Sequence, residues 1–579
     1  MKEKELSIPR PEYPRPQMVR DNWLNLNGLW EFQVDPGLSG EERGLYKKDE
    51  KFSQTINVPF CPESKLSGIG QKDFMSCVWY RRKFYMPKNW KGKRIFLHFG
   101  AVDYEADVWI NEEKVGNHQG GYTPFSFEIT NLLRKEENLL VVRALDNVRS
   151  SLQPSGKQSP KWESYGTKYT RTTGIWQTIW LEAVSSTFIQ SFRLYPDLDK
   201  GRVIFQVNIN GETEGLILNT KIFASKKKVG ERETSVRNTL FFSVELSEIY
   251  PWEPGKPFLY DLELSLGERG KCRDKVRSYF GLRKIEIQEK KVLLNNKPIF
   301  QRLILDQGFY PEGIYTAPTN EALRKDIELS LSSGFNGARL HQKVFEPYFL
   351  YWADKLGYLV WEEYPNWGID HSHPAALKII LREWLEVIER DFNHPAIIGW
   401  CPFNETPQNQ DPELIRLIYR ITKSIDSTRP VIDTSGYHHT ETDIYDCHNY
   451  EQNPEKFAAS FEAFKKDEKP WRNDPEHQVH YQGQPYFVSE YGGIWWNPSQ
   501  KDNKAWGYGK RPQTKKEFLE RYQKLTETLL FHPQISGFCY TQLYDVEQEV
   551  NGLYTYDRRP KFDPALIKKI NSQKAAIEE

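Results

Sequence analysis

The feature of this sequence that most constrains its fold is a change in hydrophobic periodicity near residue 284. Before that point, short apolar or alternating stretches of strand length are separated by turn residues such as Gly120-Gly121. After that point, strand-like stretches alternate with helical patterns. The sequence therefore predicts three domains, at residues 1–184, 185–283 and 284–579. The second has the length of a single β-sandwich.

The third domain contains eight strand candidates in about 295 residues, a number typical of a (β/α)8 barrel. A doubly wound sheet remains an alternative on the pattern alone. Residues 374–393 form the clearest helical pattern, because Leu377, Ile380, Trp384 and Val387 recur at helical spacing. The strand candidates are residues 299–305, 337–341, 359–362, 397–403, 431–434, 444–447, 485–490 and 537–542.

Composition narrows the classes of partner. The 79 basic residues balance the 79 acidic ones, which gives no support for a nucleic-acid or membrane-surface partner. No run of 18 apolar residues is present, and the first residues lack the apolar segment of a signal peptide. The six cysteines are scattered without metal-binding spacing. We therefore expect a soluble, cytoplasmic, multidomain protein.

Two carboxylates stand at the ends of predicted barrel strands. Glu405 closes the fourth strand and Glu490 closes the seventh, on opposite sides of the barrel mouth. Active sites of such barrels gather at these strand ends. Two facing carboxylates are what glycosidic bond cleavage requires, one as acid and one as nucleophile or base. The alternative is structural, in which each residue caps the following helix or pairs with a nearby arginine.

Several motifs in order along the chain resemble glycoside hydrolase family 2, which contains β-galactosidases, β-glucuronidases and β-mannosidases. The run at 390–400 followed by Asn404-Glu405 is similar to the acid/base signature of that family. The other matching stretches are residues 25–30, 108–111, 120–125, 174–177 and 280–283. The resemblance implies an N-terminal sugar-binding jelly roll, an immunoglobulin-like β-sandwich and a catalytic (β/α)8 TIM barrel.

The resemblance also implies roles for individual residues. Glu490 would be the nucleophile and Glu405 the general acid/base of a retaining double displacement that needs no cofactor or metal. We expect burial beside the second carboxylate to favour the protonated form of Glu405 at the start of the reaction. Asn404 would bond the sugar's 2-hydroxyl, and Arg339 would orient the nucleophile.

Further strand-end residues are candidates for substrate contact, although each also suits a structural role. One of Glu362 and Glu363 is expected to reach the pocket. The histidines His371, His373, His438 and His439 lack carboxylates at ligand spacing, so we expect loop residues rather than a metal site. The remaining candidates for substrate contact are Asp306, His341, His448, Tyr450, Trp495 and Tyr540.

Two departures from the family bear on the sugar. Residues 550–554 lack the Asn-x-Lys pair with which family glucuronidases hold a uronate, which disfavours a glucuronidase. Lys168 stands where the studied β-galactosidases and β-glucuronidases place an Asp; the alternative is that the same loop reaches the pocket with Tyr169 or Arg171. Loss of that acceptor leaves furanosides open as substrates.

The sequence thus predicts an exo-acting, retaining β-glycosidase that removes terminal non-reducing sugars from small oligosaccharides or glycosides. β-Galactosides are the first expectation. The alternatives are an α-L-arabinofuranosidase or β-D-galactofuranosidase on the same scaffold, a transglycosylase, and a non-catalytic carbohydrate-binding protein. A homo-oligomer is also possible, since many relatives in the family form one.

Overall fold

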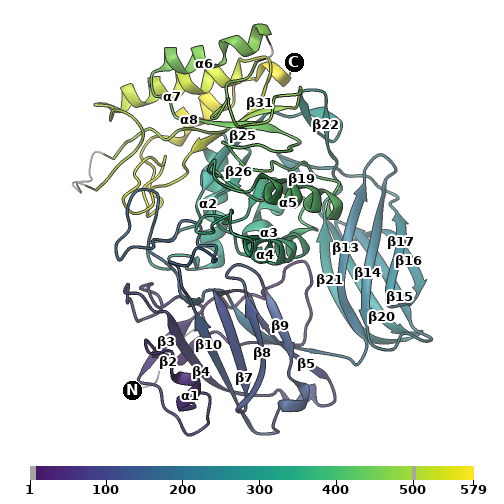
Figure 1. The fold of residues 1–579 in the computed structure, drawn as a ribbon. Helices are drawn as coiled ribbons and strands as arrows, with labels where there is room; N and C mark the ends of the chain where they lie inside the picture. Colours follow the sequence, from purple (N-terminus) through teal and green to yellow (C-terminus); the bar gives the residue numbers. More distant parts are fainter. Residues whose placement is uncertain (1–7, 468, 498–503, 579) are drawn as a thin grey trace.

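The computed structural model describes residues 8–467, 469–497 and 504–578. The expectation that the chain has no signal peptide concerns its first residues, and residues 1–7 lie outside the described ranges. Figure 1 shows three parts in chain order: a purple and blue β-domain at the N-terminal end, a blue-teal β-sandwich, and an α/β part running from teal to yellow.

The first part is an antiparallel β-sandwich whose two main sheets enclose one apolar core. The four-stranded sheet contains β1 (Trp23–Asn25), β12 (Ile179–Val184), β5 (Arg94–Phe99) and β9 (Phe125–Glu128). The six-stranded sheet contains β3 (Gln54–Val58), β2 (Gly28–Val34), β4 (Cys77–Tyr85), β10 (Glu137–Leu145), β7 (Glu105–Ile110) and β8 (Glu113–Gln119). A short pair, β11 (Gly174–Ile175) and β6 (Val102–Asp103), and helix α1 (Gly40–Arg43) complete it.

The second part is a smaller sandwich of three and four antiparallel strands. Buried and exposed side chains alternate along its strands because successive residues of a strand point to opposite faces, one of them the shared core. Its sheets are β13 (Phe188–Asp197), β14 (Arg202–Asn210) and β17 (Thr239–Glu245), and β16 (Lys227–Ser235), β15 (Ile217–Ala224), β20 (Tyr260–Glu268) and β21 (Lys271–Phe280). Two small ribbons follow, β18 (Trp252–Glu253) with β19 (Lys256–Pro257), and β22 (Ile285–Gln288) with β23 (Lys291–Leu294) and β24 (Lys297–Pro298).

The third part is a TIM barrel whose parallel strands form a curled sheet in the order β28-β27-β26-β25-β31-β30-β29. The strands are β25 (Gln301–Asp306), β26 (Gly337–Leu340), β27 (Leu359–Glu363), β28 (Ile397–Cys401), β29 (Tyr445–Asn449), β30 (Tyr486–Gly492) and β31 (Ile535–Thr541). The helices are α2 (Asn320–Ser332), α3 (Pro347–Leu356), α4 (Ala376–Asp391), α5 (Pro412–Ile425), α6 (Pro454–Asp467), α7 (Lys515–Leu530) and α8 (Pro564–Asn571).

The fifth predicted strand, 431–434, is present only as a segment joined by isolated bridges. Ile432 N donates to Trp400 O at 3.0 Å, so the segment pairs with the edge strand β28. On its other side, Ser435 Oγ donates to Asp446 of β29 at 2.8 Å. Side-chain hydrogen bonds thus replace a regular ladder at this point. The segment lies between the two edge strands, which fits the predicted barrel rather than a doubly wound sheet.

Helix α4 confirms the clearest helical pattern of the sequence, two residues shorter at each end than expected. Ile380, Trp384, Val387 and Ile388 are buried on one face, against the barrel. Full burial of an apolar side chain of this size contributes about 1.5–3 kcal/mol relative to exposure. Packing on the barrel, more than intrinsic propensity, therefore stabilises this helix.

The apolar core of the barrel continues into the two β-domains. Tyr122 and Trp176 of the first domain and Trp252 of the second belong to it. Trp252 Nε1 also donates to Asp354 O of helix α3 at 2.7 Å. None of the described helices combines the length and the apolar character that a bilayer span needs.

Candidate active site

Glu490 lies within strand β30, two residues before its end, with 4% of its surface exposed. The register of β30 against β31 shifts around this residue. Its Oε1 accepts from Arg339 Nη1 at 2.9 Å, and its Oε2 accepts from the Tyr450 hydroxyl. Burial raises the pKa of Glu490, but the charges of His448 and Arg339 outweigh burial and hold this pKa well below its ordinary value. Glu490 is therefore an ionised carboxylate.

Arg339, from strand β26, joins three site residues. Besides Glu490, its Nη2 donates to Asn404 Oδ1 at 2.5 Å and its Nε donates to Glu363 Oε2 at 2.8 Å. Burial raises the pKa of Glu363, yet the Arg339 charge lowers it overall to about 2. Of the two adjacent glutamates, Glu363 is thus the one at the site, while the carboxyl oxygens of Glu362 are buried with no partner among the described residues.

Glu405 follows strand β28 and is held by its backbone. Its N–H donates to Ser435 O at 2.9 Å, and its φ of 46° is left-handed. Its side chain is 26% exposed, against 5% for Glu490. Glu405 is therefore less buried than the sequence analysis expected. Partial exposure suits a group that must reach a leaving oxygen and a water.

His448 and Tyr450, at the end of strand β29, connect the two carboxylates. His448 Nδ1 lies 2.9 Å from Glu405 Oε1 and 3.5 Å from Glu490 Oε2. Burial lowers the pKa of His448, but the charge of Glu490 and the hydrogen bond to Glu405 raise it overall. A carboxyl oxygen of Glu405 and one of Glu490 lie within 4.8 Å of each other.

His341, which follows β26, is the last of the predicted residues at this cluster. Its Nδ1 lies 3.1 Å from Glu363 Oε1 and 4.0 Å from Glu490 Oε1. Burial lowers the pKa of His341 although Glu363 opposes this. Six predicted residues are thus brought together by side-chain contacts, namely Arg339, His341, Asn404, Glu405, His448 and Glu490, with Tyr450 attached to Glu490.

Three other predicted contacts are not brought to the carboxylates. Asp306 Oδ1 accepts from Tyr544 at 2.6 Å and from Gly308 N at 3.0 Å. Tyr540 is fully buried in the barrel wall, with its ring centroid 4.9 Å from that of Tyr522 on helix α7. Trp495 is partly exposed and packs beside Gly507.

Two aromatic residues at the site were not singled out from the sequence. Trp367, in the loop after β27, donates from Nε1 to Asn404 O at 3.1 Å. Tyr508 stacks on Tyr450 at 3.7 Å between ring centroids. Trp367 lies four residues after Glu363, so its place after a strand end was a usable signal. Tyr508 lies 16 residues past the end of β30, and no local pattern places it near the site.

The loop of the first domain that contains Lys168 reaches the barrel. Lys168 Nζ donates to Gly156 O at 2.5 Å and lies 4.7 Å from the centre of the Trp367 ring. Burial, together with the Lys157 charge, lowers the pKa of Lys168 to about 7. Tyr169 donates to Glu549 Oε2 at 2.5 Å, whereas Arg171 donates to backbone carbonyls, including Lys161 O at 2.9 Å.

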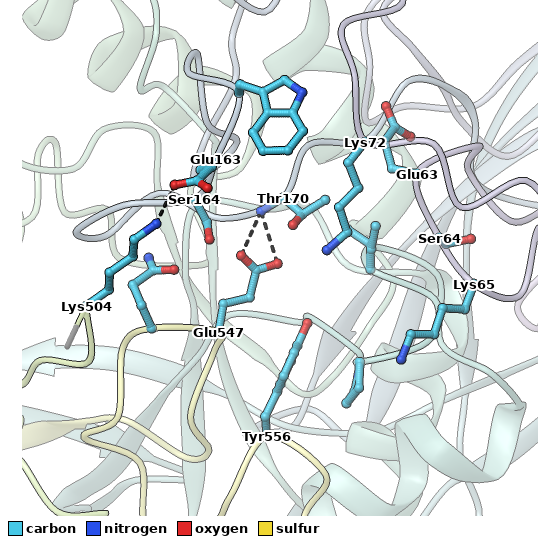
Figure 2. Close-up of a pocket in the computed structure, with 14 residues that line it drawn as sticks. Glu63, Ser64, Lys65, Lys72, Glu163, Ser164, Thr170, Lys504, Glu547 and Tyr556 are labelled. Atoms are coloured by element: carbon cyan, nitrogen blue, oxygen red, sulfur yellow. Dashed lines mark hydrogen bonds and ion pairs between the residues drawn. The ribbon is translucent and has the colours of Figure 1, made fainter. Parts of the chain in front are cut away.

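A cavity of about 590 Å³ lies where the first domain meets the barrel, and residues of both parts line it. Figure 2 shows Thr170 N directed at the carboxylate of Glu547 and Lys504 directed at Glu163 across this cavity. Neither Glu405 nor Glu490 lines it. The candidate site is therefore defined by the carboxylate cluster rather than by this cavity.

The described residues include one group with metal-ligand types, Glu405, His448 and Glu490. Within this group His448 Nδ1 lies 2.9 Å from Glu405 Oε1 and 3.5 Å from Glu490 Oε2. The hydrogen bond of His448 to Glu405 gives the arrangement another explanation. Of the four histidines considered above, His439 lies between two carboxylates, with Nδ1 2.7 Å from Asp433 and Nε2 2.9 Å from Asp446.

Comparison with family models matches the chain in three consecutive parts. Residues 24–153 match the model described as glycosyl hydrolases family 2, sugar binding domain. Residues 187–283 match the model of glycosyl hydrolases family 2, and residues 285–575, half of the chain, match that family's TIM barrel domain. The matches follow the same order as the three parts of the fold.

Curated relatives and solved structures agree with these matches. A β-galactosidase of Thermoanaerobacter pseudethanolicus is 28% identical over 376 residues, which cover 62% of this chain and 49% of that protein. A β-glucuronidase of Felis catus is 26% identical over 470 residues, 73% of this chain and 70% of that protein. The chain thus spans about half the length of the first relative.

Among solved structures, β-glucuronidase from Ruminococcus gnavus in complex with D-glucuronic acid superposes with a TM-score of 0.79 at 19% identity, covering 97% of this chain and 100% of the other. A β-glucuronidase from an uncultured Clostridium species gives a TM-score of 0.79 at 20% identity, covering 96% and 98%. At this identity the likeness shows the shared fold.

Proposed function

The chain belongs to glycoside hydrolase family 2, and we propose that it hydrolyses terminal β-glycosides with retention of configuration, with Glu490 as nucleophile and Glu405 as general acid/base. The separation of the carboxyl oxygens, within 4.8 Å, is the observation that carries this proposal. Retaining enzymes place the two carboxyl groups about 5–5.5 Å apart, whereas inverting enzymes leave about 6.5–9.5 Å for a water.

The site suits the first half of such a reaction. Arg339 and His448 keep Glu490 ionised, and Tyr450 fixes one of its oxygens. Glu490 attacks the anomeric carbon while the bond to the leaving oxygen breaks and the proton of Glu405 passes to that oxygen. The Asn404 Nδ2 amide is buried with no partner among the described residues, which suits a bond to the 2-hydroxyl that strengthens in the transition state.

The second half reverses these roles. Glu405 takes a proton from water, the water oxygen bonds to the anomeric carbon, and the glycosyl–Glu490 bond breaks. Glu405 is 26% exposed, so water can reach it without displacing the protein core. Net retention follows from two displacements on opposite faces of the sugar.

The sugar we propose is a β-galactoside, one of the two substrate classes named among the relatives. The second candidate is a furanoside, favoured by Lys168, whose ammonium is bonded to Gly156 O where related enzymes place a carboxylate. A chromogenic panel of β-galacto-, gluco- and mannopyranosides, β-glucuronide, α-arabinofuranoside and β-galactofuranoside at neutral pH tests the choice. If the protein hydrolyses none of these glycosides, the proposed function is contradicted.

A further inference from the structure

Lys157 is a buried ammonium for which the described residues offer no hydrogen bond or ion pair. It belongs to the loop between strands β10 and β11 of the first domain, and only 4% of the residue is exposed. Its Nζ lies 4.2 Å from the centre of the Trp367 ring. A buried charge is costly unless it is paired, and among the described residues only the Trp367 ring faces this ammonium, so its N–H groups are available to a ligand.

The surroundings of Lys157 place it at the candidate active site. The Trp367 indole beneath its ammonium donates to Asn404 O, and its ring centroid lies 6.2 Å from that of His341. The positive charge of Lys157 lowers the pKa of His341; only burial and the Glu363 charge affect this pKa more. Lys157 therefore faces the same space as the carboxylate cluster.

A carboxylate of the barrel, Glu549, faces that space from another side. Only 2% of Glu549 is exposed; its Oε2 accepts from Tyr169 and its Oε1 accepts from Asn551 Nδ2 at 3.0 Å. Burial raises the pKa of Glu549, while the Lys157 charge lowers it. No ion pair within 4.0 Å joins Lys157 to Glu549 among the described residues, so both charges keep bonding capacity for a third group.

Tyr508 ties Glu549 to the catalytic pair. Its ring stacks on Tyr450, which donates to Glu490. Burial raises the pKa of Tyr508, and the charges of Glu549, Glu490 and Glu405 raise it further. The segment of Tyr508 thus reaches both places: its ring stacks on Tyr450, and Trp506, two residues before it, forms a β-bridge with Glu549.

We propose that Lys157 and Glu549 recognise the terminal sugar of the substrate, Lys157 as hydrogen-bond donor and Glu549 as acceptor for ring hydroxyl groups. The proposal rests on the glycosidase function above. Because the two charges cancel, they suit a neutral polyhydroxylated sugar, whereas a uronate would bring a second negative charge towards Glu549. Glu549 supplies a hydrogen-bond acceptor for sugar hydroxyls, which a lysine at position 168 cannot be. Lys168 is a positioning residue, because its ammonium donates to the carbonyl of Gly156, the residue before Lys157.

The test uses Lys157→Met and Glu549→Gln in the full chain. Each is assayed on the best neutral glycoside of the panel and on matching deoxy-glycosides that each lack one ring hydroxyl. We expect kcat/KM on the parent to fall by at least about tenfold, as for loss of a hydrogen bond to a charged group. The wild type should discriminate against at least one deoxy-glycoside, and the variants should lose that discrimination.

Matched controls are Lys161→Met, an exposed lysine of the same loop, and Glu163→Gln, an exposed carboxylate near it. Both should behave as wild type. Lys157→Met should also melt at or above the wild-type temperature, because it removes an unpaired buried charge. A marked fall in melting temperature would indicate a structural role and overturn the proposal.

Three further outcomes are distinct. Unchanged discrimination between parent and deoxy-glycosides in both variants would overturn the recognition role and leave the glycosidase function standing. A wild-type preference for the glucuronide that disappears in Lys157→Met would overturn the assignment to neutral sugars. Hydrolysis of no glycoside by the wild type would refute the proposed function, and this inference with it.

Discussion

Arg339 Nη1 lies 2.9 Å from Glu490 Oε1, with both side chains at most 5% exposed. The guanidinium is the fixed cation of the site, since its own pKa is far above neutral pH. The ionised state of Glu490 on β30 therefore depends on a residue of β26, a strand separated from β30 in the sheet by β25 and β31.

Arg339→Met should raise the pKa of Glu490, because burial then acts with less opposition. The acid limb of the kcat/KM profile should move to higher pH, and activity near pH 5 should fall more than activity near pH 7. A pH–rate profile of the best glycoside measures this. Arg324→Met, on the surface of helix α2, is the control; a parallel loss at every pH in Arg339→Met would contradict the electrostatic role.

Substitutions of the two carboxylates should separate their roles. Glu490→Gln should remove turnover while the melting temperature stays close to that of the wild type. Glu405→Ala should lower kcat by about 10²–10⁴-fold on substrates with poor leaving groups. On an activated aryl glycoside, Glu405→Ala should form a β-glycosyl azide when azide is added, as judged by product NMR. An α-glycosyl azide from that variant would indicate instead that Glu405 is the nucleophile and Glu490 the acid/base.

His439 should make stability depend on alkaline pH. Burial lowers its pKa, but Asp433 and Asp446 raise it overall to about 10, above the ordinary 6.5. A raised pKa stabilises the fold fully below about pH 6.5, and this contribution is lost as the pH rises through about 10. His439→Gln should cost about 3–5 kcal/mol at pH 6 and flatten the decline between pH 7 and 10.

Chemical denaturation at several pH values measures that change, with exposed His373→Gln as the control. A wild-type stability that is flat from pH 6 to 10, with the same flat profile in the variant, would show that the His439 charge adds nothing to the fold.

Chelation should leave activity unchanged. Glu405, His448 and Glu490 carry ligand atoms, but the proposed mechanism uses each of them without an ion. Activity after dialysis against EDTA should equal that of the untreated protein. A loss that Zn²⁺ or Mn²⁺ restores would show instead that this group binds a metal.

The positions of seven barrel strands, and a common site for Glu405 and Glu490, were predictable from the sequence. Both predictions use hydrophobic runs and the residues at their ends, which are local properties. It did not predict the direction of each side chain at a strand end. Tyr540 turns into the wall against Tyr522 because side chains alternate along a strand. Asp306 accepts from Tyr544 through one carboxyl oxygen, while its other oxygen is buried with no hydrogen-bond partner among the described residues.

Contacts between domains could not be predicted from local patterns, because they join residues far apart in the sequence. Tyr169 and Glu549 are 380 residues apart in the chain and meet only through domain packing. No local pattern links them. The motif at Lys168 predicted that this loop matters to the site, but not which of its residues faces the barrel.

The loop of the first domain reaches the barrel mouth, so residues of two different domains surround the candidate site. Glu405, Glu490 and Arg339 all belong to the barrel, while Lys157, Lys168 and Tyr169 belong to the first domain. If the proposed roles of Lys157 and Lys168 hold, mutations in that loop should alter the preferred sugar while the reacting groups stay in place. Exchange of the loop between homologues, with the barrel left intact, is therefore the direct way to ask how much of the specificity the first domain contributes.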